Sequence, residues 1–457
     1  MNARLPTEKL HRQQDEYPSL APGGPAVSMP PWNYALNRLQ VGRAATGGCL
    51  YGGQSTTFWA PVRDLLHITN GPIGCGVYAH GNRPQVDGIS GAEVFSGINL
   101  STDFQEKDVV FGGANKLARA VVEADGLFPR NRGMTLPSTC PIALIGDDIE
   151  SVAKHTSREL RKPVIPVQCA GFRRGDGIGE THNTIIGTWR EWAAQDVEPG
   201  PRDVVLLCRE MNGAWRNIER LLVDLGLRVV ARWPGGSDRS QVAGLGSGRL
   251  VVSVDMEYWV RKLEQQFGLP SIEVSFLGPT ATRESLRAIA ACFDNEVACK
   301  AERMIADHSS DVKASLTASR RRLDGKLYFS FAPLHPRDVR VYADFGIRVG
   351  SALQGWPDRE GRWHIPETPR RYQEMTPVEV DGLLRKVQPD LIDGLGQDAA
   401  GFRTAGYSIM DDCGRDELNR AAIGFPGIDR LARELIRLFD SPTGRLVLCP
   451  WIEQRGR

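Results

Sequence analysis

The sequence predicts an α/β protein with three doubly wound, Rossmann-like domains, each built on a parallel sheet. From residue 49 onward, short apolar runs that end in glycine or proline alternate with amphipathic stretches of helical period. This alternation is typical of parallel strands joined by crossover helices. The 457 residues are enough for two to three domains, each with its own core. The expected divisions are an extension at 1–45 and domains at 46–200, 201–322 and 323–457, the last with a C-terminal helix.

The first domain is expected to begin with a cysteine-containing segment and to continue as strands and helices. The run PIALIGDD, residues 141–148, predicts a buried strand that leads into a helix over 149–160. Asp147 and Asp148 stand immediately before that helix, where a carboxylate accepts hydrogen bonds from the amides of the first turn. The run KPVIPVQCAGF, residues 162–172, predicts the next strand.

The second and third domains repeat this pattern, with glycine-rich turns between their elements. In the second domain we expect strands at 203–208, 227–233, 248–255 and 271–278, and helices at 214–226, 257–268 and 283–293. Thr282 is the expected cap of the last of these helices. In the third domain we expect strands at 326–333, 347–353, 389–395 and 406–412, and helices at 336–346 and 427–439.

Composition excludes several classes of function. The formal net charge of +1 argues against a nucleic-acid binder, which carries a basic surplus, and no uninterrupted apolar run predicts a membrane span. The N-terminus lacks the apolar core of a signal peptide, which predicts a cytoplasmic protein. Nine cysteines indicate metal ligands and buried thiols rather than disulfides. The aromatic residues show no stripe or cage and are expected to pack as ordinary core and surface residues.

Three cysteines, Cys49, Cys75 and Cys140, each stand beside glycine or proline, where the backbone turns sharply and amides approach a bulky inorganic ligand. An iron–sulfur cluster needs thiolates on its irons and amide donors near its sulfurs. The spacing matches no compact ferredoxin motif or zinc ribbon. The alternative is three structural cysteines, because free cysteine is among the most buried residue types. Cys140 and Cys169 also lie near the expected strand ends, where parallel sheets bind ligands.

Five segments carry a resemblance to a known family. In chain order they are GPIGCG, STDFQEKDVVFGG, CPIALIGDDIESVAK, FLGPTATRESLRAIAACFD and PDLI. Together they resemble the alpha subunit of the molybdenum–iron protein, the catalytic component of nitrogenase, over the stretch from Gly47 to Leu435. The resemblance implies the nitrogenase component 1 fold, with three doubly wound domains.

The resemblance assigns Cys49, Cys75 and Cys140 to an interface iron–sulfur cluster, the P-cluster, of 8Fe-7S or 4Fe-4S type. Three thiolates are fewer than the usual four, so a further ligand is expected from a partner chain. In the family that partner is a beta subunit, in an α2β2 heterotetramer, and a separate ATP-dependent iron protein delivers the electrons. The chain itself has no GKS or GKT phosphate-binding loop, so any ATP use belongs to such a partner.

The resemblance also implies a second cluster, the iron–molybdenum cofactor, which the family holds with one cysteine and one histidine. The cysteine position falls at Val252, which cannot bind iron and is interpreted as strand core. The histidine position falls in the loop of Cys413 through the segment GYSIMDDC, or at Ile423 through IGFPGID. A Cys413 thiolate could replace imidazole as an iron ligand, and a buried thiol is the alternative. These changes predict a molybdenum-free, nitrogenase-type cluster of iron, sulfur and carbide.

Four further positions bear on the expected pocket. Arg83 matches a family arginine near the cofactor, and Thr57 replaces a valine that restricts substrate access. His335 falls where the family has an arginine, and His182 is the one histidine retained from a family segment. A histidine beside a reducible cluster can deliver protons, because its pKa is near neutral. The alternative for His182 is a histidine in a glycine-rich loop that hydrogen bonds to the backbone.

These residues favour a nitrogenase-like reductase that does not reduce dinitrogen. Within that class the resemblance suggests the methylthio-alkane reductases, which cleave carbon–sulfur bonds and release methanethiol and a hydrocarbon. The alternatives are a scaffold for nitrogenase cofactor assembly, a true nitrogenase alpha subunit, and a tetrapyrrole reductase of the wider superfamily. Loss of both cofactor ligands argues against a true nitrogenase, and the catalytic-type segments argue against a scaffold.

Overall fold

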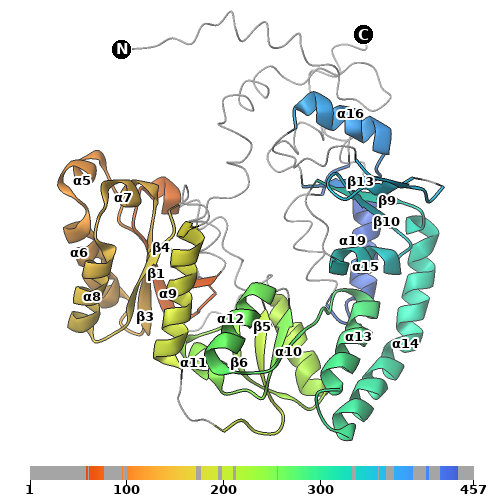
Figure 1. Ribbon diagram of the computed structural model, residues 1–457, viewed down its shortest axis with the longest axis horizontal. Helices are drawn as coiled ribbons and strands as arrows, with labels where there is room; N and C mark the ends of the chain where they lie inside the picture. The colour runs from red at the N-terminus through yellow and green to blue at the C-terminus, as the bar shows by residue number, and fades with distance from the viewer. Residues whose placement is uncertain are drawn as a thin grey trace, which may run out of the picture. The chain divides into compact units, whose positions relative to one another are not determined.

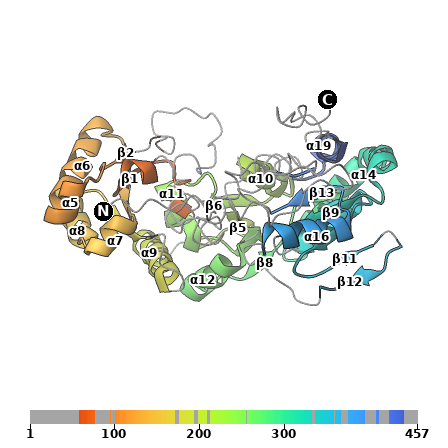
Figure 2. The same cartoon turned by 90° about the horizontal axis from the view of Figure 1, so that it is seen from above.

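The structure of the protein is a computed structural model (Figures 1 and 2). It describes residues 58–59, 61–76, 95, 98, 100–170, 176–193, 198–208, 213–254, 256–331, 336–358, 360–366, 375–394, 408–410 and 423–440. For residues 176–182, 214, 336–338 and 377 it describes the backbone alone. None of the helices in these ranges is long and apolar enough to cross a membrane.

The chain forms two compact units. One unit consists of residues 48–276 and 284–305, and the other of residues 1–47, 277–283 and 306–457. The first of these units contains two parallel sheets, and the second contains a third parallel sheet. The boundaries predicted at residues 46, 201 and 323 stay predictions, whereas the predicted class of several doubly wound parallel sheets is confirmed.

The first sheet is parallel and has the strand order β2, β1, β3, β4. Its strands are β1 (Leu65–Thr69), β2 (Leu100–Ser101), β3 (Gly133–Ser138) and β4 (Val164–Gln168). The accompanying helices are α5 (Glu106–Phe111), α6 (Ala114–Leu127), α7 (Cys140–Ile145), α8 (Ile149–Leu160) and α9 (Asp176–Trp192). Every residue of β1 and β3 is buried, as expected for strands whose two faces are both covered.

The prediction of a strand over 141–148 is wrong, because this run forms helix α7 and the strand is β3, which precedes it. Thr139 is extended and Pro141 lies in the first turn of α7, a position that proline favours because its fixed φ suits a helix start. A short apolar run does not distinguish a strand from a helical turn by itself. The helix predicted at 149–160 is confirmed as α8, and Asp148 caps it by accepting a hydrogen bond from the Ser151 amide at 2.8 Å.

The second sheet is also parallel, with the order β6, β5, β7, β8. Its strands are β5 (Asp203–Cys208), β6 (Arg228–Pro234), β7 (Leu250–Val254) and β8 (Ser271–Glu273). Its helices include α10 (Ala214–Asp224), α11 (Arg239–Ala243) and α12 (Glu257–Phe267). All four strands and the helices at 214–226 and 257–268 confirm the sequence prediction, although β8 is shorter than predicted.

Two long helices follow the second sheet, α13 (Gly278–Ala290) and α14 (Asn295–Leu323). The prediction that Thr282 caps a helix is wrong, because α13 already begins at Gly278. The Thr282 hydroxyl instead donates to the Gly278 carbonyl at 2.7 Å, one turn back along the same helix. The sequence prediction did not include α14.

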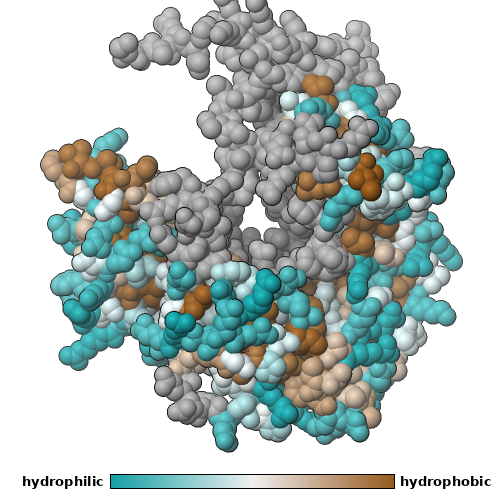
Figure 3. All heavy atoms as spheres, in the orientation of Figure 1, coloured by the Kyte–Doolittle hydropathy of each residue, from teal (hydrophilic) through white to brown (hydrophobic). Residues whose placement is uncertain are grey.

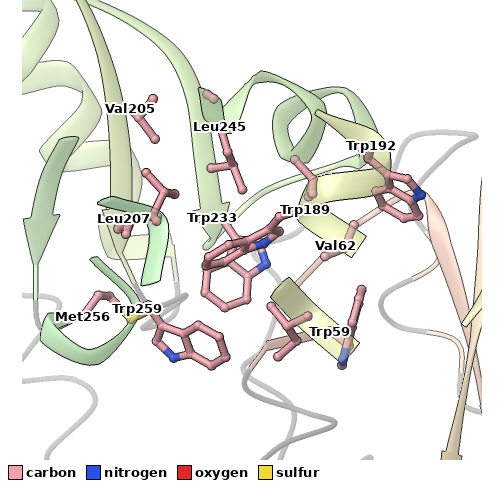
Figure 4. Close-up of a cluster of buried hydrophobic side chains, with 14 of the residues drawn as sticks. Trp59, Val62, Trp189, Trp192, Val205, Leu207, Trp233, Leu245, Met256 and Trp259 are labelled. Carbon is pink, nitrogen blue, oxygen red and sulfur yellow. The ribbon is translucent and has the colours of Figure 1, made fainter. Parts of the chain in front are cut away.

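A single hydrophobic core lies between the first and second sheets. It combines residues of both sheets with five tryptophans (Figure 4), of which Trp189 on α9, Trp233 on β6 and Trp259 on α12 contact one another. We call these three residues the tryptophan cluster. Their ring centroids lie 5.0 to 5.6 Å apart. The three rings pack in the core, as expected of aromatic residues, although their meeting could not be read from the sequence.

The third sheet is parallel and has the order β10, β9, β13. Its strands are β9 (Leu327–Ser330), β10 (Arg348–Ser351) and β13 (Leu391–Asp393), with an added hairpin of β11 (Trp356–Pro357) and β12 (Trp363–His364). The helices are α15 (Pro336–Asp344), α16 (Pro377–Val387) and α19 (Ile428–Asp440). Of the strand predicted at 406–412, Ile409 makes an isolated bridge to Ile392, and residues 406, 407, 411 and 412 lie outside the described ranges.

Candidate functional site

The carboxyl edge of the first sheet brings the two described candidate cysteines onto neighbouring loops. β1 and β3 are adjacent and parallel, so the segments that follow them leave the sheet at the same edge. Cys75 lies in a helical turn over residues 73–76, after β1, and Cys140 is the first residue of α7, after β3. Both thiols are half-buried. This arrangement is the one that parallel sheets use to present ligand-binding groups.

Direct hydrogen bonds join these two loops. The Thr139 amide and the Thr139 hydroxyl both donate to the Asn70 carbonyl, at 3.1 and 2.9 Å. Gly71 is required for this approach, because a Cβ atom there would lie 2.1 Å from the Thr139 Oγ1 atom. The first glycine of GPIGCG therefore lets the Cys75 loop lie against the residue that precedes Cys140.

The segment that begins STDF adds a third loop to this contact. The Gly71 amide donates to the Thr102 hydroxyl at 3.1 Å, and the Thr102 hydroxyl donates to Asn70 Oδ1 at 3.2 Å. The Ser101 hydroxyl and the Phe104 amide both donate to the Gly71 carbonyl. Two segments that are separated in the sequence thus hold the Cys75 loop through hydrogen bonds, one to the Asn70 carbonyl and the other mainly to Gly71.

An ion pair between Asp108 and Lys116 holds the part of this segment that leads into α5. Asp108 accepts hydrogen bonds from the Gln105 amide at 2.9 Å and from Lys116 Nζ at 2.8 Å. The hydrogen bond from Lys116 lowers the pKa of the Asp108 carboxyl below its ordinary value. Lys116 also donates to the Asp103 carbonyl at 2.6 Å. The turn before α5 is therefore tied to α6 by one ammonium group.

Cys169 follows β4 at the same edge of the sheet. Its side chain is fully buried, and its thiol donates to the Ser138 carbonyl at 3.4 Å. A fully buried thiol that is hydrogen bonded to the backbone fits a structural role better than metal binding.

Most of the other predicted site residues lie outside the residues that the structure describes. Cys49, Thr57, Arg83, His335 and Cys413 lie outside the described residues. His182 lies within helix α9, whose backbone alone is described at that position. The glycine-rich loop expected around His182 is therefore a helix, and the role of the His182 side chain stays a prediction.

Val252 and Ile423 both lie in apolar surroundings. Val252 is fully buried in β7, between Leu206 of β5 and Ile272 of β8. Ile423 is buried and forms an isolated bridge with Leu277. Within the described ranges, no group of three or more His, Cys, Asp or Glu side chains could hold a metal ion. Cys75 and Cys140 therefore need ligands from outside these ranges to complete a metal site.

An exposed apolar surface lies beside this edge, and the sequence interpretation missed it. We call it the apolar patch, and it consists of Ile73, Val109, Val110, Phe111 and Leu144. Phe111 is 86% exposed, Leu144 74% and Val110 73%. α5 and α7, which carry four of these residues, contact each other, and Figure 3 shows the hydrophobic colouring over α5. The run VVF in the sequence does not by itself distinguish an exposed surface from core.

Comparison with known proteins identifies the class. The nitrogenase component 1 type oxidoreductase family matches residues 49–440, which is most of the chain. The chain belongs to this family.

Relatives of this chain include nitrogenase molybdenum–iron protein alpha chains. The alpha chain from Nostoc sp. (strain PCC 7120) is 35% identical over 429 residues, covering 88% of this chain and 85% of the relative. That from Azotobacter vinelandii is 33% identical over 471 residues, covering 98% and 94%. A solved structure described as nitrogenase Cp1 at pH 6.5 superposes with a TM-score of 0.73 at 24% identity, over 88% of this chain and 90% of that chain. The predicted fold and the predicted resemblance to nitrogenase alpha subunits are thus confirmed, and the methylthio-alkane reductase subtype stays a prediction.

Proposed function

We propose that this chain is the catalytic alpha subunit of a nitrogenase-like iron–sulfur reductase that cleaves the carbon–sulfur bond of small methylthio-alkanes. The observation that supports the reductase class is the meeting of the Cys75 and Cys140 loops at one sheet edge. The reaction takes up two electrons and two protons, breaks one carbon–sulfur bond and forms one S–H and one C–H bond. The products are methanethiol and a hydrocarbon.

An interface cluster fits the residues at this edge. Cys75 and Cys140 are half-buried cysteines on loops that hydrogen bonds hold in place, and such thiols are suited to bind iron as thiolates. Cys49 and residues of a beta subunit would complete the ligand set in an α2β2 heterotetramer. When bound, a cluster of 8Fe-7S or 4Fe-4S type supplies one-electron transfer. The chain's own contribution is to hold two thiolates on loops that are joined by hydrogen bonds from Thr139 to the Asn70 carbonyl.

The apolar patch is proposed as the docking surface for an ATP-dependent iron protein that donates electrons. A contiguous exposed apolar surface on a protein marks an interaction site, and this one lies on the loops and helices that carry the candidate thiols. A partner bound there is close to the site that its electrons must reach. Val110→Ser with Phe111→Ser should reduce electron transfer from the iron protein and leave iron content unchanged. Val223→Ser, which changes an exposed apolar residue on α10, is the matched control.

The proposed substrate class rests on the residue that stands where the family resemblance expects a cofactor ligand. Val252 is a fully buried aliphatic residue within β7, where the family resemblance expects a cysteine ligand. A site without that ligand is suited to a molybdenum-free iron–sulfur–carbide cluster, with Cys413 as its proposed protein ligand. Arg83 and Thr57 are proposed to line this pocket. His182 and His335 are proposed to deliver the two protons, because imidazole titrates near neutral pH.

A true nitrogenase is the second candidate, because the relatives given above are molybdenum–iron protein alpha chains. Val252 is the residue that argues against it. The two candidates differ in metal content and in product.

The deciding experiment is metal analysis of the anaerobically purified complex with its beta partner, together with product analysis. For a methylthio-alkane reductase we expect iron beyond what the interface cluster holds, no molybdenum, and methanethiol from a methylthio-alkane with the iron protein, ATP and reductant. Cys413→Ala should lose the additional iron, and Cys292→Ala, at an exposed thiol, should not. Molybdenum together with ammonia from dinitrogen would establish the second candidate instead. Iron for the interface cluster alone, with no methanethiol, would contradict the proposal.

A further inference from the structure

Asn70 stands where the loops that carry Cys75 and Cys140 leave the first sheet. It follows β1 directly and extends that strand by an isolated parallel bridge to Ser138. Its carbonyl accepts both hydrogen bonds from Thr139, the residue before Cys140. Asn70 is only 1% exposed. A buried carboxamide side chain therefore lies at the sheet edge where the two candidate iron ligands are held.

Thr102 determines which way the Asn70 carboxamide is turned. The Thr102 hydroxyl accepts a hydrogen bond from the Gly71 amide at 3.1 Å and donates to Asn70 Oδ1 at 3.2 Å. With the carboxamide turned the other way, the Asn70 NH2 group would face Thr102 Oγ1. The hydroxyl hydrogen of Thr102 and the Oδ1 atom of Asn70 would then both lose their partner. The NH2 group is therefore the end of the Asn70 side chain that is directed away from Thr102.

This NH2 group lacks the acceptors that a second buried asparagine of the same sheet possesses. Asn131 lies at the opposite edge, before β3, and its Nδ2 atom donates to Asp125 Oδ1 at 2.7 Å and to the Phe128 carbonyl at 2.8 Å. Asn70 Nδ2 is buried and has no hydrogen-bond partner among the described residues. Because an unsatisfied buried donor destabilises a fold, the position of Asn70 calls for an acceptor.

Asn70 lies on the face of β1 that helix α7 covers. Leu66 and Ile68 precede it at two-residue spacing, so the three side chains share one face of the strand. Leu66 and Ile68 belong to the same core cluster as Ile142 of α7, and Cys140 is the first residue of that helix. The unsatisfied donor and the candidate ligand Cys140 are therefore on the same side of the sheet.

An iron–sulfur cluster provides the kind of acceptor that this donor requires. Thiolates and cluster sulfides are anionic, and hydrogen bonds to them influence the reduction potential because they stabilise the more negative, reduced state. We propose that Asn70 Nδ2 donates a hydrogen bond to an anionic sulfur of the interface cluster beside Cys140 and thereby raises the reduction potential of that cluster. The inference rests on the proposed function, because the acceptor is present only when the cluster is bound.

The same substitution at the two asparagines separates this role from a structural one. The complex with the beta partner is purified anaerobically as wild type, Asn70→Leu and Asn131→Leu, and the reduction potential of the interface cluster is titrated by EPR. We expect a lower potential in Asn70→Leu, because the reduced state loses a donor, and the wild-type potential in Asn131→Leu. Thermal unfolding of the iron-free complexes should show the larger loss in Asn131→Leu, which breaks the hydrogen bonds to Asp125 and Phe128. Equal potentials in wild type and Asn70→Leu, or equal shifts in both variants, would overturn the proposal.

A measurement on the wild type decides the question even if Asn70→Leu does not fold. The protein is grown with asparagine whose side-chain amide nitrogen is isotopically labelled, and pulsed EPR of the paramagnetic cluster records the coupling to that nitrogen. We expect a coupling in the wild type that is absent from Asn70→Asp, which keeps an oxygen for Thr102 and lacks the amide nitrogen. A wild-type complex that holds iron but shows no coupling would overturn this hydrogen bond alone. A wild-type complex that binds no iron would contradict the proposed function and this inference together.

Discussion

Gly71 shows at the scale of one residue why the segment GPIGCG needs a glycine at its start. A Cβ atom at this position would meet Thr139 at 2.1 Å from Oγ1 and 2.8 Å from Cβ. Thr139 cannot turn away without loss, because its hydroxyl donates to the Asn70 carbonyl. The glycine is therefore explained by the close approach of two loops, and the sequence alone shows the residue but not the neighbour that requires it.

Gly71→Ala should destabilise the protein by about 1–3 kcal/mol, the usual cost of overpacking, and should lower the iron content of the complex. The measurement is the midpoint of thermal unfolding, together with iron analysis. Thr139→Gly combined with Gly71→Ala should recover part of both losses relative to the sum of the single substitutions, because it removes the atoms that the new methyl group meets. Strictly additive losses would contradict the proposed clash.

Asp64 offers a second test at the residue scale. It is a buried carboxylate at the start of β1 that accepts a hydrogen bond from the Arg239 amide at 2.9 Å. Burial raises the pKa of the Asp64 carboxyl above its ordinary value, although the Arg239 amide opposes this shift. The folded state therefore holds the proton more tightly than the unfolded state, so ionisation of Asp64 costs folding free energy as pH rises above about 4, the unfolded pKa.

Asp64→Asn keeps an acceptor for the Arg239 amide and removes the charge. We expect the variant to unfold at the same temperature as the wild type or higher at pH 7–8, with the difference shrinking as the pH is lowered toward about 4. Thermal unfolding across this pH range measures the effect. A variant that is less stable than wild type at neutral pH, with the deficit vanishing in acid, would mean that the ionised carboxylate stabilises the fold.

At the scale of the element, strands with a turn on each side could be predicted from the sequence. The secondary structure of a short apolar run could not. The strand at 203–208 has the bounds of β5, because its continuous apolar run has turns on both sides. The run PIALI is also apolar but forms α7, since Thr139 and Pro141 favour a helix start and β3 already fills that place in the sheet. Cys75 and Cys140 were recognisable as candidates from their glycine and proline neighbours.

The hydrogen bonds that hold the candidate site could not be predicted from the sequence, for a related reason. Thr102 reaches the Cys75 loop because β2 pairs with β1, and this pairing is between strands that are not joined by a short turn. Nothing in the segment STDF specifies that its threonine meets Gly71. The apolar patch is similar, because a run such as VVF is recognised as a surface only after α5 is known to lie outside the core.

Helix α8 provides a prediction at this scale. Asp148 caps its first turn by accepting from the Ser151 amide at 2.8 Å, so Asp148→Ala should cost about 1 kcal/mol of folding free energy. Asp148→Asn, which keeps an acceptor, should cost less. Chemical denaturation measures both, with Glu159→Ala on the exposed side of the same helix as the control. Equal losses for Asp148→Ala and Glu159→Ala would contradict a capping role.

At the scale of the whole molecule, the core shared by two sheets determines how one compact unit holds together. Residues of β4 and α9 from the first sheet and residues of β5, β6 and β7 from the second contribute to one buried cluster. The sequence predicted the sheets separately, because each has its own strand and turn pattern. Their common core depends on Trp189, Trp233 and Trp259, which lie on three elements and whose meeting no local pattern encodes.

The last prediction concerns this shared core. Trp189→Ala should cost about 3–5 kcal/mol, as expected for removal of a buried aromatic side chain, and the loss should be felt in both sheets because the ring contacts Trp233 and Trp259 across the core. Hydrogen exchange measures this: amides of β3 and of β5 should lose protection together. Leu384→Ala, in the core of the third sheet, is the control and should lower protection in β9 and β13. Loss confined to β3 and β4 would show that the first sheet is stabilised independently of the second.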